Sequence, residues 1–136
     1  MLAKRAQVTY LLARLPIAMS MFGHGLDRLP KIAGFSQHMV QQFNNAVLPL
    51  AAVEVFSHAL PFVELITGIL LIVGLFTRFA TIIGVLVMLA LIFGSSMIEQ
   101  WENVFTQIIY GIYFALLYYF SAYNYYSVDR LLQRHN

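Results

Sequence analysis

The chain has 136 residues, of which 60% are hydrophobic and only 10% are charged. Because about 25% of the residues of an average soluble domain are charged, this composition excludes an ordinary soluble globule and indicates a protein whose surface faces lipid. The formal net charge of +2 and the scattered basic residues argue against a nucleic-acid partner, and the absence of cysteine excludes thiol nucleophiles and cysteine-ligated clusters on this chain.

Four apolar segments are each about 20 residues long, the length that a helix needs to cross a ~30 Å hydrocarbon core. These segments cover residues 6–26, 55–76, 79–98 and 104–122. Gly74 and Thr77-Arg78 separate the second segment from the third, and Thr77 is predicted to cap the third helix. The pattern predicts a single membrane domain with an all-α fold, a transmembrane four-helix bundle.

The loop between the first two predicted spans is long enough to hold a short helix of its own. Ser36 is predicted to cap this helix, and an apolar stripe follows it, formed by Met39, Val40, Phe43 and Val47. Such an amphipathic segment is expected to lie flat on the outer membrane surface or over the mouth of the bundle.

The orientation of the bundle follows from the basic residues near the ends of the spans. One side carries Lys4, Arg5, Arg78, Arg130 and Arg134, and the other side carries only Arg28 and Lys31. Because lysine and arginine accumulate on the cytoplasmic side of membrane proteins, both termini are predicted to be cytoplasmic.

Two charged residues fall inside the predicted spans, Arg14 in the first and Glu64 in the second. A charge in hydrocarbon is unfavourable by at least ~2.5 kcal/mol, so each residue is expected to face a partner or a cavity. With both spans centred in the bilayer, Arg14 and Glu64 lie about 7–8 Å apart along the membrane normal, at ~1.5 Å per residue. We therefore expect an Arg14–Glu64 ion pair, which either only joins two helices or also anchors a polar head group or relays a proton.

Two histidines, His24 and His58, fall at similar predicted depths near the outer ends of the first two spans. They are expected to flank one pocket, where imidazole can hydrogen-bond a quinone carbonyl, transfer protons or ligate haem b; alternatively, both rings are simply hydrated at the interface. Gln107 is predicted to face the bundle, because its amide would lack partners in lipid. A cofactor head group would then contact His24, His58, Arg14 and Gln107, and no metal site is predicted.

Four fragments of the sequence carry a resemblance to a known family. They are Arg14…Phe22-Gly23-His24-Gly25-Leu26…Leu29, Pro61-Phe62-Val63-Glu64-Leu65-Ile66-Thr67-Gly68, Gly74-Leu75-Phe76-Thr77-Arg78 and Tyr126-Ser127-Val128-Asp129-Arg130-Leu131-Leu132. In order and spacing they resemble the DoxX family of small bacterial membrane proteins. The resemblance implies a four-helix bundle in the bacterial inner membrane. The chain departs from the family in its long, Gln-rich first loop and in Ala122-Tyr123-Asn124, which replaces a glycine–proline turn.

The better-known members of that family are subunits of a quinone-reducing thiosulfate oxidoreductase, and other relatives are proposed to join membrane redox complexes that protect against oxidative stress. The resemblance thus implies an integral membrane subunit of a quinone-linked oxidoreductase. The paired polar residues suggest that a quinone head group would lie near His24 and His58, that Arg14 and Glu64 would stabilise charge or pass protons, and that a partner protein would supply electrons. A non-enzymatic scaffold or lipid-binding subunit is the alternative. The sequence leaves open whether the chain is itself an enzyme and whether it forms a homo-oligomer.

Overall fold

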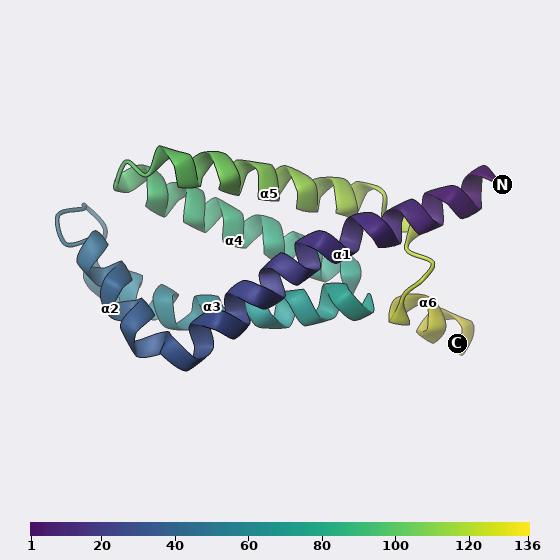
Figure 1. Cartoon of the computed structure of the whole chain (residues 1–136), viewed down its shortest axis with the longest axis horizontal. Coiled ribbons are helices and arrows are strands. Elements are labelled where there is room, and N and C mark those ends of the chain that lie inside the picture. The colour runs from purple at the N-terminus through teal and green to yellow at the C-terminus, as the bar shows by residue number, and fades with distance from the viewer.

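A computed structural model describes the whole chain, residues 1–136, and is entirely helical (Figure 1). The helices are α1 Leu2–Arg28, α2 Ile32–Gln42, α3 Leu50–Val73, α4 Thr77–Met97, α5 Trp101–Tyr119 and α6 Val128–Arg134, with short 3-10 turns at Leu29–Lys31 and Ser121–Tyr123. The four long helices coincide with the four predicted apolar segments to within five residues at each end. The predicted all-α fold is therefore confirmed.

The long helices form two pairs, because α1 packs along α3 and α4 packs along α5. The chain reverses direction at each connection between long helices (Figure 1). As a result, the start of α1 and the short helix α6 lie at one end of the molecule, called here the terminal end (Figure 1). Helix α2 and the turn between α4 and α5 lie at the opposite end, called here the α2 end.

Two glycines allow α1 and α3 to touch through their backbones. A Cβ atom on Gly25 would lie 2.5 Å from the backbone nitrogen of Leu65, and one on Gly68 would lie 2.4 Å from that of Phe22. Real side chains do not approach a backbone so closely, so only glycine fits at these two positions. Small residues commonly allow such close packing between membrane helices. These contacts fix the register of the first helix pair.

A hydrophobic cluster joins the two helix pairs. Its nine buried members are Tyr10, Ile17, Ala18, Met21, Leu71, Ala80, Met88, Phe114 and Leu117. Three tyrosines add polar links between α1 and α5. Tyr10 donates a hydrogen bond to the main-chain oxygen of Leu117 at 2.7 Å, and Tyr113 donates one to that of Ala13 at 2.5 Å. The hydroxyl groups of Tyr110 and Ser20 share a third hydrogen bond at 2.6 Å. Apolar packing and phenol hydroxyl groups therefore hold the pairs together.

Arg14 is buried, with 2% of its surface exposed, but it does not pair with Glu64. Its guanidinium donates hydrogen bonds to Asn124 Oδ1 at 2.5 Å and to the main-chain oxygen of Tyr126 at 3.0 Å. The predicted Arg14–Glu64 ion pair is thus wrong. Neutral oxygen atoms of the C-terminal segment, which folds back over the bundle, satisfy this buried charge instead, and Arg14 Nε has no partner.

The N-terminus of α4 is capped from a distance rather than by Thr77. The carboxylate of Asp129 accepts hydrogen bonds from the backbone N–H groups of Phe76 at 2.7 Å and Thr77 at 2.9 Å. Phe76 precedes the helix with a left-handed φ of 48°, so Thr77 already lies inside the helix and its hydroxyl accepts a bond from Asn124 Nδ2. The predicted Thr77 cap is therefore wrong, and Asp129 supplies the acceptors.

The short helix predicted in the first loop is present as α2, but it begins at Ile32 rather than at Ser36 and ends at Gln42, so Phe43 and Val47 of the predicted apolar stripe lie beyond it. Ser36 is buried inside this helix, where its hydroxyl accepts a hydrogen bond from Ser57 Oγ at 2.7 Å. Helix α2 packs against α3. A contact between two serines therefore fixes the position of α2, and Ser36 is not its cap.

Two helices, α3 and α4, are long and apolar enough to cross a membrane, judged by length and composition, with mean hydropathies of 1.9 and 2.3. Helix α1 has 27 residues and α5 has 19, so both also have the length of a span. Both carry more polar side chains, among them Arg14 in α1 and Gln107 in α5. Both side chains are turned into the protein: Arg14 bonds to Asn124 of the C-terminal segment, and Gln107 bonds to Ser95 of α4.

Candidate functional site

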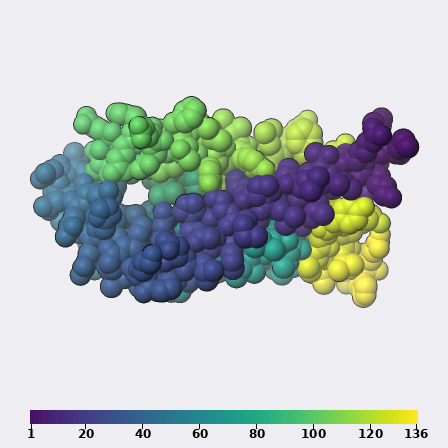
Figure 2. All heavy atoms as spheres, viewed as in Figure 1, coloured from purple at the N-terminus to yellow at the C-terminus, as the bar shows by residue number.

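A cavity of about 470 Å³ lies between the two helix pairs at the α2 end. Figure 2 shows an opening there between α2, in blue, and α5, in green. Fifteen of the 25 lining residues are hydrophobic, so the cavity suits a ligand that is mostly apolar. Its polar side chains are those of His24, Arg28, Gln42, Glu64, Ser95, Gln100, Asn103, Thr106 and Gln107, together with the hydroxyl group of Tyr110, which is one of the fifteen.

Glu64 lines the cavity and pairs with Arg28, which sits in the last turn of α1. Arg28 Nη1 lies 2.7 Å from one carboxylate oxygen of Glu64 and 2.9 Å from the other. The Glu64 side chain is only 4% exposed, whereas that of Arg28 is 27% exposed and its guanidinium lies 4.8 Å from the centre of the Phe35 ring. The buried carboxylate is thus paired with a cation that can still reach the cavity.

His24 also lines the cavity and is exposed to solvent. Its Nδ1 atom lies 2.7 Å from the main-chain oxygen of Ser20, one turn earlier in α1. Because a carbonyl oxygen can only accept, Nδ1 carries the hydrogen, and Nε2 of the neutral ring is a free acceptor. His24 therefore has one fixed nitrogen atom and one that is available to a ligand or to a proton.

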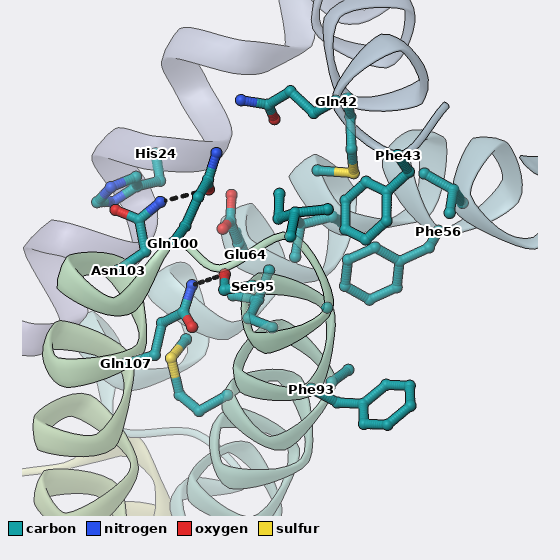
Figure 3. Close-up of a pocket in the computed structure, with 18 of the residues that line it drawn as sticks. His24, Gln42, Phe43, Phe56, Glu64, Phe93, Ser95, Gln100, Asn103 and Gln107 are labelled. Atoms are coloured by element: carbon teal, nitrogen blue, oxygen red, sulfur yellow. Dashed lines mark hydrogen bonds between the residues drawn. The ribbon is translucent and has the colours of Figure 1, made fainter. Parts of the chain in front are cut away.

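Gln107 of α5 and Ser95 of α4 form the opposite wall, where Gln107 Nε2 donates a hydrogen bond to Ser95 Oγ at 3.0 Å. Figure 3 shows both side chains below Glu64, and the aromatic rings of Phe43 and Phe56 on the apolar side of the cavity. Gln107 Oε1 is buried and has no hydrogen-bond partner. An unpaired buried acceptor is unfavourable by about 1–3 kcal/mol, so a donor that reached it would be bound.

His58 does not share this cavity with His24, so the predicted pair of histidines around one pocket is wrong. His58 is not among the lining residues, and its Nδ1 lies 2.9 Å from the main-chain oxygen of Glu54 and 3.3 Å from Ser36 Oγ. A haem b held between two histidines needs both rings at one site. The residues present therefore do not fit that cofactor.

The register of α1 against α3 explains why Arg14 and Glu64 do not meet. Gly25 lies against Leu65 and Phe22 lies against Gly68. In an antiparallel pair with this register, Glu64 faces the last turns of α1, whereas Arg14 faces the end of α3 about twelve residues further on. At ~1.5 Å per residue the two side chains start about 18 Å apart along the helices. The prediction assumes that both spans are centred at the same depth, whereas in the observed register their centres are offset.

Arg28 and Asn124 are the site and core residues that the sequence interpretation missed. The sequence interpretation uses Arg28 only as a marker of orientation, but in the observed register Arg28 of α1 lies close to the level of Glu64 of α3, and its long side chain reaches the carboxylate. Asn124 was noted only as a departure from the family pattern, but it bonds Arg14, Thr77 and Asp129 at once. The polar tail was the available signal, since a buried arginine needs acceptors.

A comparison with protein-family models matches residues 9–96 to the DoxX family. This match covers more than half of the chain. The chain belongs to the DoxX family. The resemblance seen in the sequence fragments is therefore confirmed, and the protein is a DoxX family membrane protein. No curated protein and no solved structure matches the chain.

The match to the DoxX family contains five of the ten polar lining residues of the cavity, among them His24, Arg28, Glu64 and Ser95. It ends before α5, so Gln107 and the C-terminal tail lie outside it. The likeness of Tyr126-Ser127-Val128-Asp129-Arg130 to the tail of the family stays a prediction.

Proposed function

We propose that this DoxX family protein is the membrane subunit of a quinone-linked oxidoreductase and that its cavity at the α2 end receives the quinone head group. One observation carries the proposal: an apolar cavity of about 470 Å³ holds an unpaired amide oxygen, Gln107 Oε1, on one wall. The Arg28–Glu64 ion pair lies on the other side of the same cavity. This combination of size, apolar lining and few polar groups is typical of sites for small, mostly apolar molecules.

The chemistry of Gln107 suits both redox forms of a quinone. A carboxamide offers two N–H donors on one side and a carbonyl acceptor on the other. A quinone carbonyl needs a donor, and the hydroxyl of the reduced form needs an acceptor. Rotation of the Gln107 amide about its last bond would present either group to the ligand, with Ser95 as the partner of the group left behind.

A bound quinone would supply a couple that takes up two electrons and two protons. The chain's own residues would bind and orient the ring and conduct protons. His24 is exposed at the cavity and has a free Nε2, so it would exchange protons between the ligand and the aqueous side. Electrons would come from a partner protein, because the chain has no cysteine and carries no redox-active side-chain cluster.

We further propose that α1, α3, α4 and α5 all cross the bacterial inner membrane, with the terminal end cytoplasmic. The charge distribution supports this orientation, because most arginine and lysine residues lie near the terminal end. The quinone would then enter through the opening beside α2, from the outer leaflet.

Binding of a short-chain ubiquinone analogue to the protein in mild detergent tests the proposal. Trp101 is the only tryptophan and adjoins Gln100 of the cavity wall, so quenching of its fluorescence reports a quinone at the cavity. The expected result is saturable quenching in the wild-type protein and affinity about fivefold to tenfold lower in Gln107→Leu, since one hydrogen bond is lost.

The matched control is Gln37→Leu on α2, an exposed glutamine that does not line the cavity. Its affinity should equal that of the wild type. Quenching that rises linearly and equally in all three proteins would mean that quinone only dissolves in the micelle, and the proposed site would be rejected. If a folded Gln107→Leu variant bound the quinone saturably and with the wild-type affinity, Gln107 would not be part of the site.

A further inference from the structure

A second cavity, of about 600 Å³, lies at the terminal end, between the start of α4 and the C-terminal segment. Only 5 of its 14 lining residues are hydrophobic, so its character is opposite to that of the cavity at the α2 end. Arg78 and Arg130 line it, and Asp129 is its only acidic side chain. That carboxylate accepts hydrogen bonds from the first N–H groups of α4 and is therefore turned into the protein.

Neither arginine of this cavity has an anionic partner. The ion pairs in the structure are Arg28–Glu64 and Lys31–Asp27, both at the other end. Arg78 Nε donates to Ser121 Oγ at 2.9 Å, which holds the guanidinium in place and leaves both terminal nitrogens free. The guanidinium of Arg130 lies 5.3 Å from the centre of the Tyr125 ring and makes no hydrogen bond. Two positioned cations with free donors thus face one cavity.

The charge around this cavity is strongly positive. Six of the eight lysine and arginine residues lie at the terminal end, with Asp129 as the one acidic side chain there among six in the chain. Arg14 is among these six cations, and its partners are neutral oxygens. An anion in the cavity would therefore be attracted by several cations, and the only acidic side chain there is already engaged.

The same cavity carries exposed apolar side chains beside its arginines. Phe76, Phe79 and Leu132 line it and are 62%, 60% and 52% exposed. A free inorganic anion would use only the guanidinium groups. A ligand with an anionic phosphate and acyl chains would use both kinds of surface, because arginine forks bind phosphate oxygens in pairs and lipid tails pack on phenyl rings.

We propose that this cavity binds the head group of an anionic phospholipid, with Arg78 and Arg130 holding the phosphate and Phe76 and Phe79 contacting the acyl chains. The lipid would lie against the α3–α4 turn and the C-terminal segment. It would thereby stabilise the terminal end of the bundle, where the hydrogen bonds of Arg14 and Asp129 already connect the C-terminal segment to the helices. This site is separate from the quinone cavity and does not depend on the function proposed for it.

The test compares retention of dioleoyl phosphatidylglycerol and dioleoyl phosphatidylcholine by the detergent-solubilised full chain, measured by native mass spectrometry. The site variant is Arg78→Gln with Arg130→Gln, and the matched control is Lys4→Gln with Arg5→Gln. The control removes the same charge from the same end but lies outside the cavity. An arginine near a membrane surface contributes about fivefold to the binding of anionic lipid, so the site variant should bind phosphatidylglycerol about 30-fold more weakly.

Arg130→Gln alone keeps the test valid if the double variant fails to fold, because that side chain makes no hydrogen bond; about fivefold weaker binding is then expected. Equal losses in the site and control variants would overturn the proposal, since binding would follow only net charge. Equal retention of the two lipids by the wild type would also overturn it. Inorganic phosphate and sn-glycerol 1-phosphate, added at increasing concentration, separate the two sources of phosphate. If one of these soluble anions displaced the lipid with an affinity equal to that of the lipid, the site would be assigned to a soluble anion. This result would contradict the lipid assignment.

Discussion

Glu64 and Arg28 form a bifurcated ion pair, in which Arg28 Nη1 lies 2.7 Å from one carboxylate oxygen of Glu64 and 2.9 Å from the other. The carboxylate comes from the middle of α3 and the guanidinium from the last turn of α1. The pair therefore closes the polar side of the cavity and also joins two helices. Removing one partner should leave a buried charge without compensation.

We predict that Arg28→Leu destabilises the protein by roughly 2–3 kcal/mol, because Glu64 is left buried and unpaired. The double variant Arg28→Leu with Glu64→Leu should recover most of that loss. Thermal unfolding in detergent, followed by circular dichroism, measures both. The discriminating control is Arg14→Leu with Glu64→Leu, which should be less stable than either single variant. Rescue by that combination, and not by the first, would mean that Glu64 pairs with Arg14 after all.

We predict that Gly68→Ala disrupts the contact between α1 and α3. The added methyl group would lie 2.4 Å from the backbone nitrogen of Phe22, so the helices must separate, at a cost of about 1–3 kcal/mol. Gly23→Ala on the same helix pair is the matched control, because a Cβ at Gly23 meets no atom within 4 Å. Equal melting temperatures for the two variants would contradict the register described here.

We predict that Asp129→Asn loosens the start of α4 and destabilises the protein by about 1–2 kcal/mol, because the carboxylate caps two backbone N–H groups. Hydrogen exchange of the amides of Phe76 and Thr77 should accelerate. Asp27→Asn is the control with the same change of charge. The hydrogen bond from Lys31 lowers the pKa of Asp27, but this exposed pair joins no helices, so a much smaller effect is expected. A larger loss from Asp27→Asn than from Asp129→Asn would contradict the assigned roles.

We predict that both termini react from the cytoplasmic side. The chain has no native cysteine, so single cysteines at Lys4, Asn136 and Asn44 report their own exposure. A membrane-impermeant maleimide applied to cells should label Asn44→Cys, in the loop after α2, but not the other two. Lysis should then expose Lys4→Cys and Asn136→Cys to the reagent. Labelling of a terminal cysteine in intact cells would contradict the proposed four crossings or their orientation.

The helices were predictable from the sequence because apolar length and interrupting residues are local signals. Gly74 ends α3 with a left-handed φ of 73°, a conformation that glycine adopts freely. A Cβ at that position would also lie 2.8 Å from Arg14 Nη1, so glycine is needed there for packing as well. The sequence alone predicts that the helix ends at Gly74, but it does not predict that Gly74 also packs against Arg14.

The partners of the buried charges were not predictable because they depend on helix register and on a distant tail. Depth counted from the centre of each span placed Arg14 near Glu64, whereas the glycine contacts between α1 and α3 set the pairing differently. Asn124 reaches Arg14 from 110 positions away in the chain. The sequence predicts that Gln107 faces the bundle, and its hydrogen bond to Ser95 confirms this. This prediction succeeds because the free-energy penalty for an amide in lipid does not depend on helix register.

The most direct measurement of the central claim is photocrosslinking with a quinone analogue that carries a diazirine, followed by peptide mapping. The label should appear on the walls of the cavity at the α2 end, in the peptides that contain Ser95 and Gln107, and an excess of unlabelled short-chain quinone should suppress it. Labelling confined to exposed positions outside the cavity, such as Ile66 or Phe79, or labelling that the excess quinone does not reduce, would contradict a quinone site in this cavity.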